Sequence, residues 1–333
     1  MLTLAPVLSD HAVFARGKEI RVFGRADGKI TAHFLGMTRE TEAEGDFCLS
    51  FPPQKAGGPY EMTVETGKES VTLRDLYVGE VFLFAGQSNM QFKLGEAAHG
   101  EEDLAEDGLI RAFHVRQLEG GDAFDERWTP MTRENSLNWS AIAAFVSRLW
   151  KKEKDVPVGA LCLYQGAAVI QTFLSPASLA PFVFRPEEMH PDHTHELFRL
   201  WNPPSLLYEK MVLPTVPFAL SGAVWYQGES NTSPAEGARY REMLEALIAE
   251  WRSLYRDPAL PFVIVRINDF LTPFSEEGWK LVQKGEEEAV RETAGTALVP
   301  VSDLGEHELI HPTNKRGVSR RIARELLRLL DGE

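Results

Sequence analysis

From residue 77 onward, short apolar segments alternate with longer segments whose apolar residues recur every three or four positions. Short apolar runs bounded by turn residues are typical of strands buried on both faces, and the longer spacing is typical of amphipathic helices. The expected strands are 81–85, 158–164, 221–226, 261–267 and 297–301. The expected helices are 141–152, 240–255, 276–293 and 313–330. This alternation predicts an α/β fold with a parallel sheet covered by helices on both faces.

The segment before this alternation has a different rhythm. Residues 19–75 contain short strand-like stretches that are separated by glycines and turn residues. Such a pattern predicts a small antiparallel β-sandwich. We therefore expect two domains, an N-terminal β-sandwich at 1–76 and a three-layer α/β/α domain at 77–333.

Charge and cysteine content narrow the possible partners. The chain has 35 Lys and Arg against 49 Asp and Glu, a net charge of −14, which disfavours nucleic acid as a partner. Cys48 and Cys162 lack metal-type spacing, so we expect neither a disulfide framework nor a metal site from them. Residues 1–14 have no basic start and no continuous apolar run, so we expect no signal peptide, no membrane association and a cytoplasmic location. The sequence leaves the oligomeric state open.

Polar residues gather after several of the expected strands, in the segments 86–90, 165–168, 227–231 and 308–312. Open α/β sheets place their sites at the carboxyl ends of the strands, so we expect these segments to meet. Together they supply a hydroxyl, several amides and an imidazole. Acyl transfer needs this set: a serine, a histidine that takes its proton, and donors for the oxyanion.

Ser88 and His311 are the candidates for the serine and the histidine. Gly86 allows a tight turn between strand and loop, which presents Ser88 with its own backbone N–H free for an oxyanion hole. The surrounding residues do not form the G-x-S-x-G elbow, because position 90 is methionine. A serine in such a loop is by itself an ordinary polar residue, and only the other loops favour a catalytic role.

Three motifs carry a resemblance to a known family. The segments Gly86–Met90, Trp225–Asn231 and Ile310–Lys315, in this order and spacing, resemble the sialate O-acetylesterase branch of the SGNH hydrolases. The similarity covers nearly the whole chain, including the region before residue 77. It implies an SGNH-type α/β fold and a serine carboxylic-ester hydrolase, without cofactor or metal, that removes acetyl groups from the hydroxyls of a sugar or oligosaccharide.

The resemblance also implies roles for single residues. Ser88 is the nucleophile, and His311 is the base that later protonates the leaving hydroxyl. The implied oxyanion donors are the amide of Ser88, the amide of Gly166 or Ala167, and a side chain of the third loop, Gln227 being favoured over Asn231. The supporting residues expected beside them are Gln87, Asn89, Glu229 and Asp303, with Glu229 bracing its own loop.

The acid of a Ser-His-acid triad has several candidates. The superfamily places Asp three residues before the histidine, and this chain has Glu308 there. We predict that Glu308 accepts the Nδ1 proton of His311. Asp303 and a backbone carbonyl are the alternatives, and a solvated loop carboxylate is the plain interpretation of Glu308.

Two other classes of protein compete with this interpretation. His307, Glu308 and His311 spell the zinc-peptidase signature H-E-x-x-H, which needs both histidines on one helical face. Pro312 disfavours helical geometry at His311, and this argues against a zinc metallopeptidase. A non-catalytic carbohydrate-binding relative is the other class, and the presence of both Ser88 and His311 argues against it.

The sequence is less informative about substrate and surface. His190, His193 and His195 lie among acidic residues in a proline-rich stretch, 175–204, which predicts a solvated surface excursion more than a metal site. An O-acetylated sialic acid, acetylxylan and another acetylated glycan fit the chemistry equally well. A cation near the site would favour the sialate carboxylate, and Arg266 is the candidate.

Overall fold

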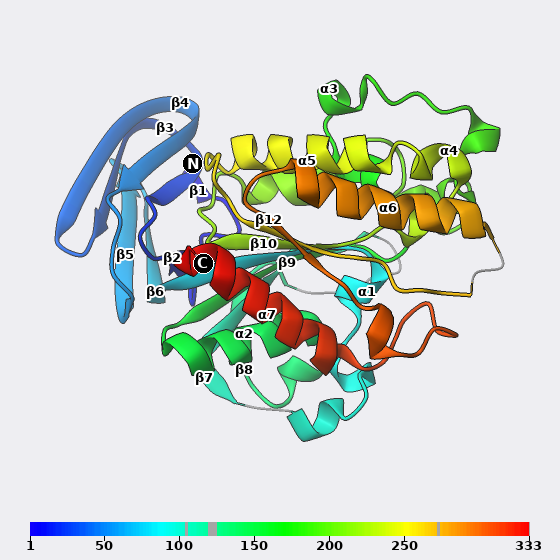
Figure 1. The fold of residues 1–333 in the computed structure, drawn as a ribbon. Coiled ribbons are helices and arrows are strands. Elements are labelled where there is room, and N and C mark those ends of the chain that lie inside the picture. Colours follow the sequence, from blue (N-terminus) through cyan, green and yellow to red (C-terminus); the bar gives the residue numbers. More distant parts are fainter. Residues whose placement is uncertain (104–105, 119–124, 272–273, 333) are drawn as a thin grey trace.

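The computed structural model describes residues 1–103, 106–118, 125–271 and 274–332 of the chain. It has a bent antiparallel region near the N-terminus and a layered α/β region that contains the rest (Figure 1). The strands of the layered region are β6 (Ser70–Gly86), β7 (Asp107–His114), β8 (Trp128–Met131), β9 (Val158–Tyr164), β10 (Gly222–Tyr226), β11 (Phe262–Val265) and β12 (Thr296–Val299). The helices are α1 (Ser88–Gln91), α2 (Ala141–Lys154), α3 (Pro176–Leu179), α4 (Pro234–Gly237), α5 (Tyr240–Leu254), α6 (Glu276–Glu292) and α7 (Lys315–Asp331).

A parallel sheet forms the middle layer, in the order β7-β9-β6-β10-β11-β12. Strand β8 adds to its edge by pairing antiparallel with β7. Helices α2 and α7 cover one face, while α5 and α6 cover the other (Figure 1). This confirms the expected mixed α/β fold and its two helical layers.

Strand β6 shows why both faces need helices. Phe82 and Phe84 belong to the core beneath α2 and α7, whereas Val81, Leu83 and Ala85 belong to the core on the opposite face. Successive side chains of a strand point to opposite faces, so a continuous apolar run needs an apolar partner on each side. The apolar run that predicted this strand therefore also required the three layers.

The N-terminal region is joined to this sheet through one strand. Its other strands are β1 (Thr3–Leu4), β2 (Val13–Ala15), β3 (Ile20–Phe34), β4 (Met37–Phe51) and β5 (Gly57–Thr66). Strand β6 pairs antiparallel with β5 in its first half and parallel with β9 and β10 in its second half. The expected boundary between residues 76 and 77 thus falls inside β6, and all twelve described strands form one connected sheet.

Some elements differ from expectation. Strands β7 and β8 were not predicted, because β7 begins with Asp107 and Gly108 and contains Arg111, which breaks its apolar run. Arg111 is 2% exposed, and it donates to the Asp75 carboxylate at 2.9 Å while stacking on the Tyr77 ring. The charge is therefore satisfied by tertiary partners that the local pattern cannot reveal. No described helix combines the length and the apolar content that a membrane crossing requires.

Candidate active site

Loops from the carboxyl ends of β6, β9 and β10 meet the segment before α7 around one cavity of about 400 Å³. Ser88, Gly166, Glu229 and His311 all line it, one from each of the four loops. Strand β9 pairs with β6 on one side and β10 pairs with it on the other, so the order of the strands reverses at β6. Open α/β sheets bind ligands at such a switch point. The prediction that these four loops converge is confirmed.

A tight turn after β6 presents Ser88. Gly86 has a φ of 141°, and a Cβ added there would lie 2.0 Å from the carbonyl oxygen of Tyr226. No residue with a side chain fits this combination of backbone angle and close approach. Gln87 then donates its backbone N–H to the same carbonyl at 3.0 Å, and helix α1 starts at Ser88.

Ser88 and His311 are in direct contact. The Ser88 Oγ lies 2.7 Å from the His311 Nε2, which allows the hydroxyl to donate to the ring nitrogen. Burial lowers the pKa of His311, and the nearby Lys315 charge lowers it further. The imidazole is therefore neutral at physiological pH and able to accept the serine proton.

No carboxylate completes a triad among the described residues. Glu308 is exposed, with neither a hydrogen bond nor an ion pair to any of them. Asp303 accepts from Arg321 at 2.7 Å, and Glu306 accepts from the Thr313 hydroxyl at 2.7 Å. The structure thus does not place Glu308 or Asp303 at the His311 Nδ1, since the loop turns both side chains away, and it shows a Ser-His dyad.

Backbone donors are available beside the nucleophile. Within the described ranges, the N–H groups of Ser88, Gly166 and Ala167 have no hydrogen-bond acceptor, and all three residues line the cavity. A Cβ added to Gly166 would lie 4.0 Å from the Ser88 Cβ, so the second loop passes next to the nucleophile. Unpaired N–H groups in this position are what a developing oxyanion needs.

The side chains of Gln227 and Asn231 lie elsewhere. Both are fully buried beneath the cavity. The Gln227 amide donates to Gln87, Ala168 and Asn231, and the Asn231 amide donates to Gln171 and Glu236. The structure therefore does not place the predicted side-chain oxyanion donor at the cavity, because these amides are already used to join the loops.

Gln87 fastens the nucleophile turn to the third loop. Its Oε1 accepts from the backbone N–H groups of Gly228 and Ser230, both at 3.3 Å. Its Nε2 donates to the Ser230 hydroxyl at 3.2 Å. The supporting role predicted for Gln87 is thus structural, through a buried amide with several partners.

Asn89 links the loop that carries Ser88 to the loop that carries His311. Its Nδ2 donates to Glu229 at 2.6 Å and to the Ile310 carbonyl at 2.9 Å, next to His311. Its Oδ1 accepts from Lys315 at 2.7 Å. Burial raises the pKa of Glu229 and lowers that of Lys315 to about 7, opposed by the attraction between them. Sequence reasoning missed Lys315, whose only signal was its place in the third motif.

The segment 175–204 is largely exposed, as expected of a surface excursion, but the side chains of two of its three histidines are buried. His190 is 4% exposed, and the His193 ring lies 2.8 Å from the buried Glu236 carboxylate. Asp192 and Trp201 line the cavity, and Trp201 donates to the Gly166 carbonyl at 2.9 Å. His195 alone of the three histidines is exposed as expected, stacked on Phe198. The proline-rich composition of this segment gave no indication that part of it lines the cavity.

The zinc signature is not arranged for a metal. Its segment contains no helix, so His307 and His311 do not share a helical face. His307 lies on the surface with its Nδ1 2.9 Å from the Asp269 carbonyl, while His311 faces Ser88. Within the described residues no cluster of three or more His, Cys, Asp or Glu side chains suits a metal ion.

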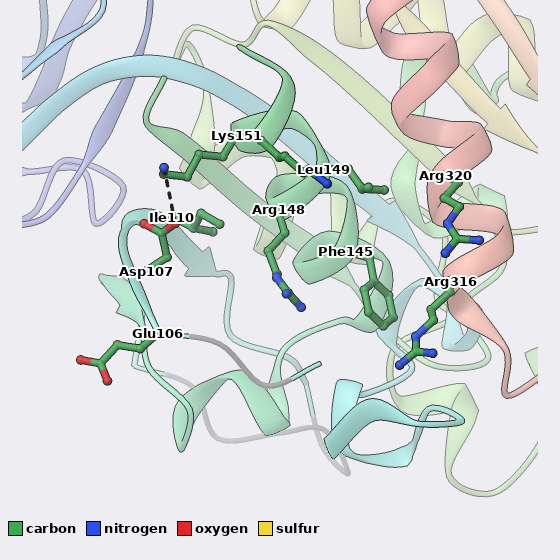
Figure 2. Close-up of a pocket in the computed structure, with 10 residues that line it drawn as sticks. Glu106, Asp107, Ile110, Phe145, Arg148, Leu149, Lys151, Arg316 and Arg320 are labelled. Atoms are coloured by element: carbon green, nitrogen blue, oxygen red, sulfur yellow. Dashed lines mark ion pairs between the residues drawn. The ribbon is translucent and has the colours of Figure 1, made fainter. Parts of the chain in front are cut away.

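A second, larger hollow of about 620 Å³ lies between α2 and α7 (Figure 2). Arg148, Lys152, Arg316 and Arg320 line it, together with the ion pair of Asp107 and Lys151. Its lining holds neither a serine nor a histidine, so size does not identify the catalytic cavity.

Comparison with known proteins agrees with this geometry. The family described as carbohydrate esterase, sialic acid-specific acetylesterase, matches residues 78–328. The chain belongs to this family. Its nucleophile turn, third loop and histidine loop all fall within the matched region.

Individual members of the family are similar over most of this chain. A sialate O-acetylesterase from Pongo abelii is 25% identical, covering 92% of this chain and 66% of the relative. The human sialate O-acetylesterase is 25% identical, covering 81% and 58%. This chain thus spans less than two thirds of either relative. A crystal structure of a carbohydrate acetylesterase from Xanthomonas citri is 29% identical, with a TM-score of 0.87, covering 99% of this chain and 76% of that one.

Proposed function

We propose that this protein is a carbohydrate O-acetylesterase in which Ser88 and His311 act as a catalytic dyad. The observation that carries the proposal is the 2.7 Å contact between the Ser88 Oγ and the His311 Nε2. It lies in a cavity that also holds unpaired amide N–H groups. Membership of the carbohydrate esterase family supports acetylated sugars as the substrate class.

The geometry supports a two-step reaction. The Ser88 oxygen attacks the acetyl carbonyl while its proton passes to the His311 Nε2. The N–H groups of Ser88 and Gly166 then stabilise the oxyanion, and His311 returns the proton to the sugar hydroxyl as it leaves. Water, deprotonated by His311, cleaves the acetyl-serine and releases acetate. Without an acid at Nδ1, orientation of the ring depends on the backbone around it.

Acetate release by the purified protein tests this function. We expect hydrolysis of 4-nitrophenyl acetate and of an acetylated sugar, with loss of both activities in Ser88→Ala. A protein that binds acetylated sugars but releases no acetate would instead be the non-catalytic relative. Activity that a chelator removes and zinc restores would indicate the metallopeptidase-type chemistry of H-E-x-x-H.

The expected domain division and the expected cellular location remain proposals. A division into residues 1–76 and 77–333 is supported by the change from antiparallel to parallel pairing along β6. Whether residues 1–76 behave as an independent sandwich domain is testable by expressing them alone. The cytoplasmic location stays a prediction of the sequence.

A further inference from the structure

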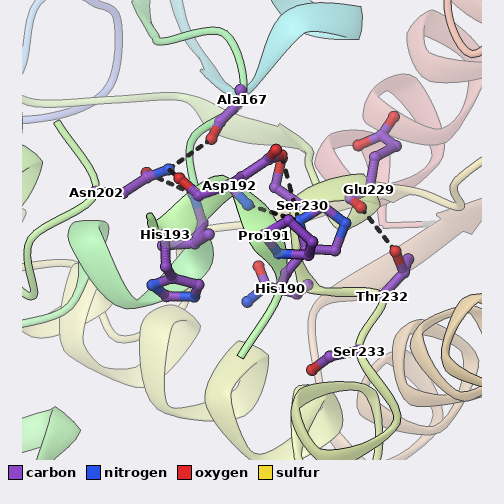
Figure 3. Close-up of polar contacts among 12 residues, drawn as sticks. Ala167, His190, Pro191, Asp192, His193, Asn202, Glu229, Ser230, Thr232 and Ser233 are labelled. Atoms are coloured by element: carbon purple, nitrogen blue, oxygen red, sulfur yellow. Dashed lines mark hydrogen bonds and ion pairs between the residues drawn. The ribbon is translucent and has the colours of Figure 1, made fainter. Parts of the chain in front are cut away.

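Part of the wall of the cavity comes from the segment 175–204. Asp192 and His190 lie in this wall beside the aromatic side chains of Phe198 and Trp201 (Figure 3 shows the polar pair). Sugar sites commonly combine a carboxylate, which accepts hydroxyl protons, with apolar faces that pack against the ring. The composition of this wall therefore fits a sugar ring whose acetyl group reaches Ser88.

Asp192 is held in place and retains an open acceptor. Its Oδ2 accepts from the Ser230 hydroxyl at 2.7 Å and lies 3.4 Å from the His190 Nδ1. Its Oδ1 has no partner among the described residues. Burial raises the pKa of Asp192, but the proximity of the His190 ring and the hydrogen bond from Ser230 outweigh it and leave a net lowering. The side chain is thus an oriented carboxylate at neutral pH with one oxygen available.

His190 supplies a second, independent observation. Asp192 donates its backbone N–H to the His190 Nδ1 at 3.2 Å, which leaves the proton of the neutral ring on Nε2. That Nε2 is buried and has no partner among the described residues. Leaving a buried donor unpaired lowers stability, and a ligand oxygen arriving in the cavity would satisfy it.

The cavity holds one carboxylate, Asp192, that no lysine or arginine of the described residues offsets, whereas Lys315 offsets the buried Glu229. Its lining includes Asp192 and Glu229 but neither lysine nor arginine. Arg266, the expected sialate partner, is instead paired with Glu287 at 2.9 Å and Asp269 at 3.1 Å. Lys315 is buried against Asn89, and the residues outside the described ranges include neither lysine nor arginine in sequence. A sugar carboxylate in this cavity would be repelled by Asp192, and no lysine or arginine of the lining would bind it.

We propose that Asp192, oriented by Ser230 and His190, forms a subsite that selects uncharged acetylated sugars and disfavours those that carry a carboxylate. The proposal rests on the proposed esterase function and adds the class of sugar. It differs from the substrate that the family description names, and it rests on the side chains that this chain has in the segment 175–204.

The test compares two substrates that differ in one charge. N-acetyl-9-O-acetylneuraminic acid and its methyl ester carry the same acetyl group, and 4-nitrophenyl acetate reports the reaction without a sugar. We expect kcat/KM for acetate release to be about tenfold or more higher for the methyl ester than for the acid. A wild-type protein that prefers the acid would overturn the proposal.

Variants assign the preference to Asp192. Asp192→Asn is expected to bring the ratio of the two sugar esters close to one and to lower kcat/KM for the methyl ester more than for 4-nitrophenyl acetate. Ser230→Ala keeps the charge but frees the carboxylate, so it should weaken sugar hydrolysis and keep the ratio. Glu196→Gln, on an exposed carboxylate of the same segment, is the matched control. An unchanged ratio in folded Asp192→Asn would contradict the assignment.

Failure of the esterase function can be separated from failure of the subsite. If no acetate is released from any of the three esters, the function is wrong. Calorimetric binding of N-acetylneuraminic acid and its methyl ester to wild-type protein then tests the subsite alone. Tighter binding of the methyl ester, lost in Asp192→Asn, would support it, and tighter binding of the acid would overturn it.

Discussion

The two loops that meet where Ser88 contacts His311 are anchored in different ways. The Ser88 loop is held by the close approach at Gly86 and by the buried side chains of Gln87 and Asn89. The His311 loop is half-buried, with residues 307–309 exposed, and Asn89 binds its Ile310 carbonyl from the side of Ser88. The turn that carries Ser88 is therefore held by its own residues, whereas His311 is held through the neighbouring Ile310.

This contrast bears on the proposed dyad of Ser88 and His311, in which no carboxylate holds the histidine. In a triad a carboxylate fixes the tautomer and orientation of the histidine. Here the ring has no such partner among the described residues, and the carbonyl of the preceding Ile310 accepts from Asn89, which also binds Lys315 and Glu229. The four predictions that follow test this arrangement, beginning with the largest expected effect.

Removal of the two reacting side chains should have the largest effect. Ser88→Ala and His311→Ala are each expected to lower kcat for 4-nitrophenyl acetate by roughly 10³-fold or more. The double variant should be little worse than either single variant, because the two groups act as one unit. Multiplicative losses, or retention of a tenth of wild-type kcat by folded Ser88→Ala, would contradict the dyad.

Loss of the link between the loops should have an intermediate effect. Asn89→Ala removes both donors and the acceptor, so we expect kcat to fall about 10- to 100-fold. The buried Glu229 and Lys315 lose a partner as well, which should lower the free energy of unfolding by about 2 kcal/mol. Kinetics and denaturant unfolding measure the two effects. Asn135→Ala, at an asparagine bound within its own surface turn, is the control for kinetics. Wild-type kcat in Asn89→Ala would show that the link does not position His311.

Removal of the Lys315 charge should alter the pH profile more than the maximal rate. The pKa of His311 is lowered by burial and then by Lys315. At the pH where His311 titrates, below its ordinary value, Lys315 with a pKa of about 7 still carries its charge. Lys315→Met should therefore raise the pKa of His311 and move the ascending limb of kcat/KM to higher pH.

Lys280→Met provides the control for that experiment, since it removes the charge of an exposed lysine that is paired with Glu276. Its profile should match the wild type. The carboxylates of Glu229 and Glu306 attract Lys315 and thereby favour the charge that acts on the imidazole. An ascending limb that moves to lower pH in Lys315→Met would contradict the electrostatic account.

Loss of the loop carboxylates should have the smallest effect. Glu308→Gln and Asp303→Asn are both expected to keep kcat within about threefold of wild type, since neither side chain contacts His311. The steady-state rates of the two variants measured side by side provide the check. A loss beyond tenfold in Glu308→Gln alone would mean that the loop rearranges to form a triad during turnover.

The layered fold and the dyad were predictable from local patterns. Apolar runs of strand length separated by amphipathic periods define a parallel sheet, and such a sheet brings the residues after its strands to one edge. Ser88, Gly166 and His311 follow from that rule and from the three motifs. Gly86 was also predictable, because a turn from a buried strand needs a residue without a side chain.

Only the tertiary structure decided the role of each remaining polar side chain. Gln227 and Asn231 carry the right amides, yet they are buried and bound to other loops, while Glu308 has the right spacing but faces away from the ring. Asp192 lies far from the motifs in sequence, and Lys315 belongs to the third motif without a predicted role, yet folding places one in the cavity wall and the other against Asn89. Sequence specifies which donors and acceptors exist, but their partners depend on which distant segments pack against them, and neither burial nor contact is encoded locally.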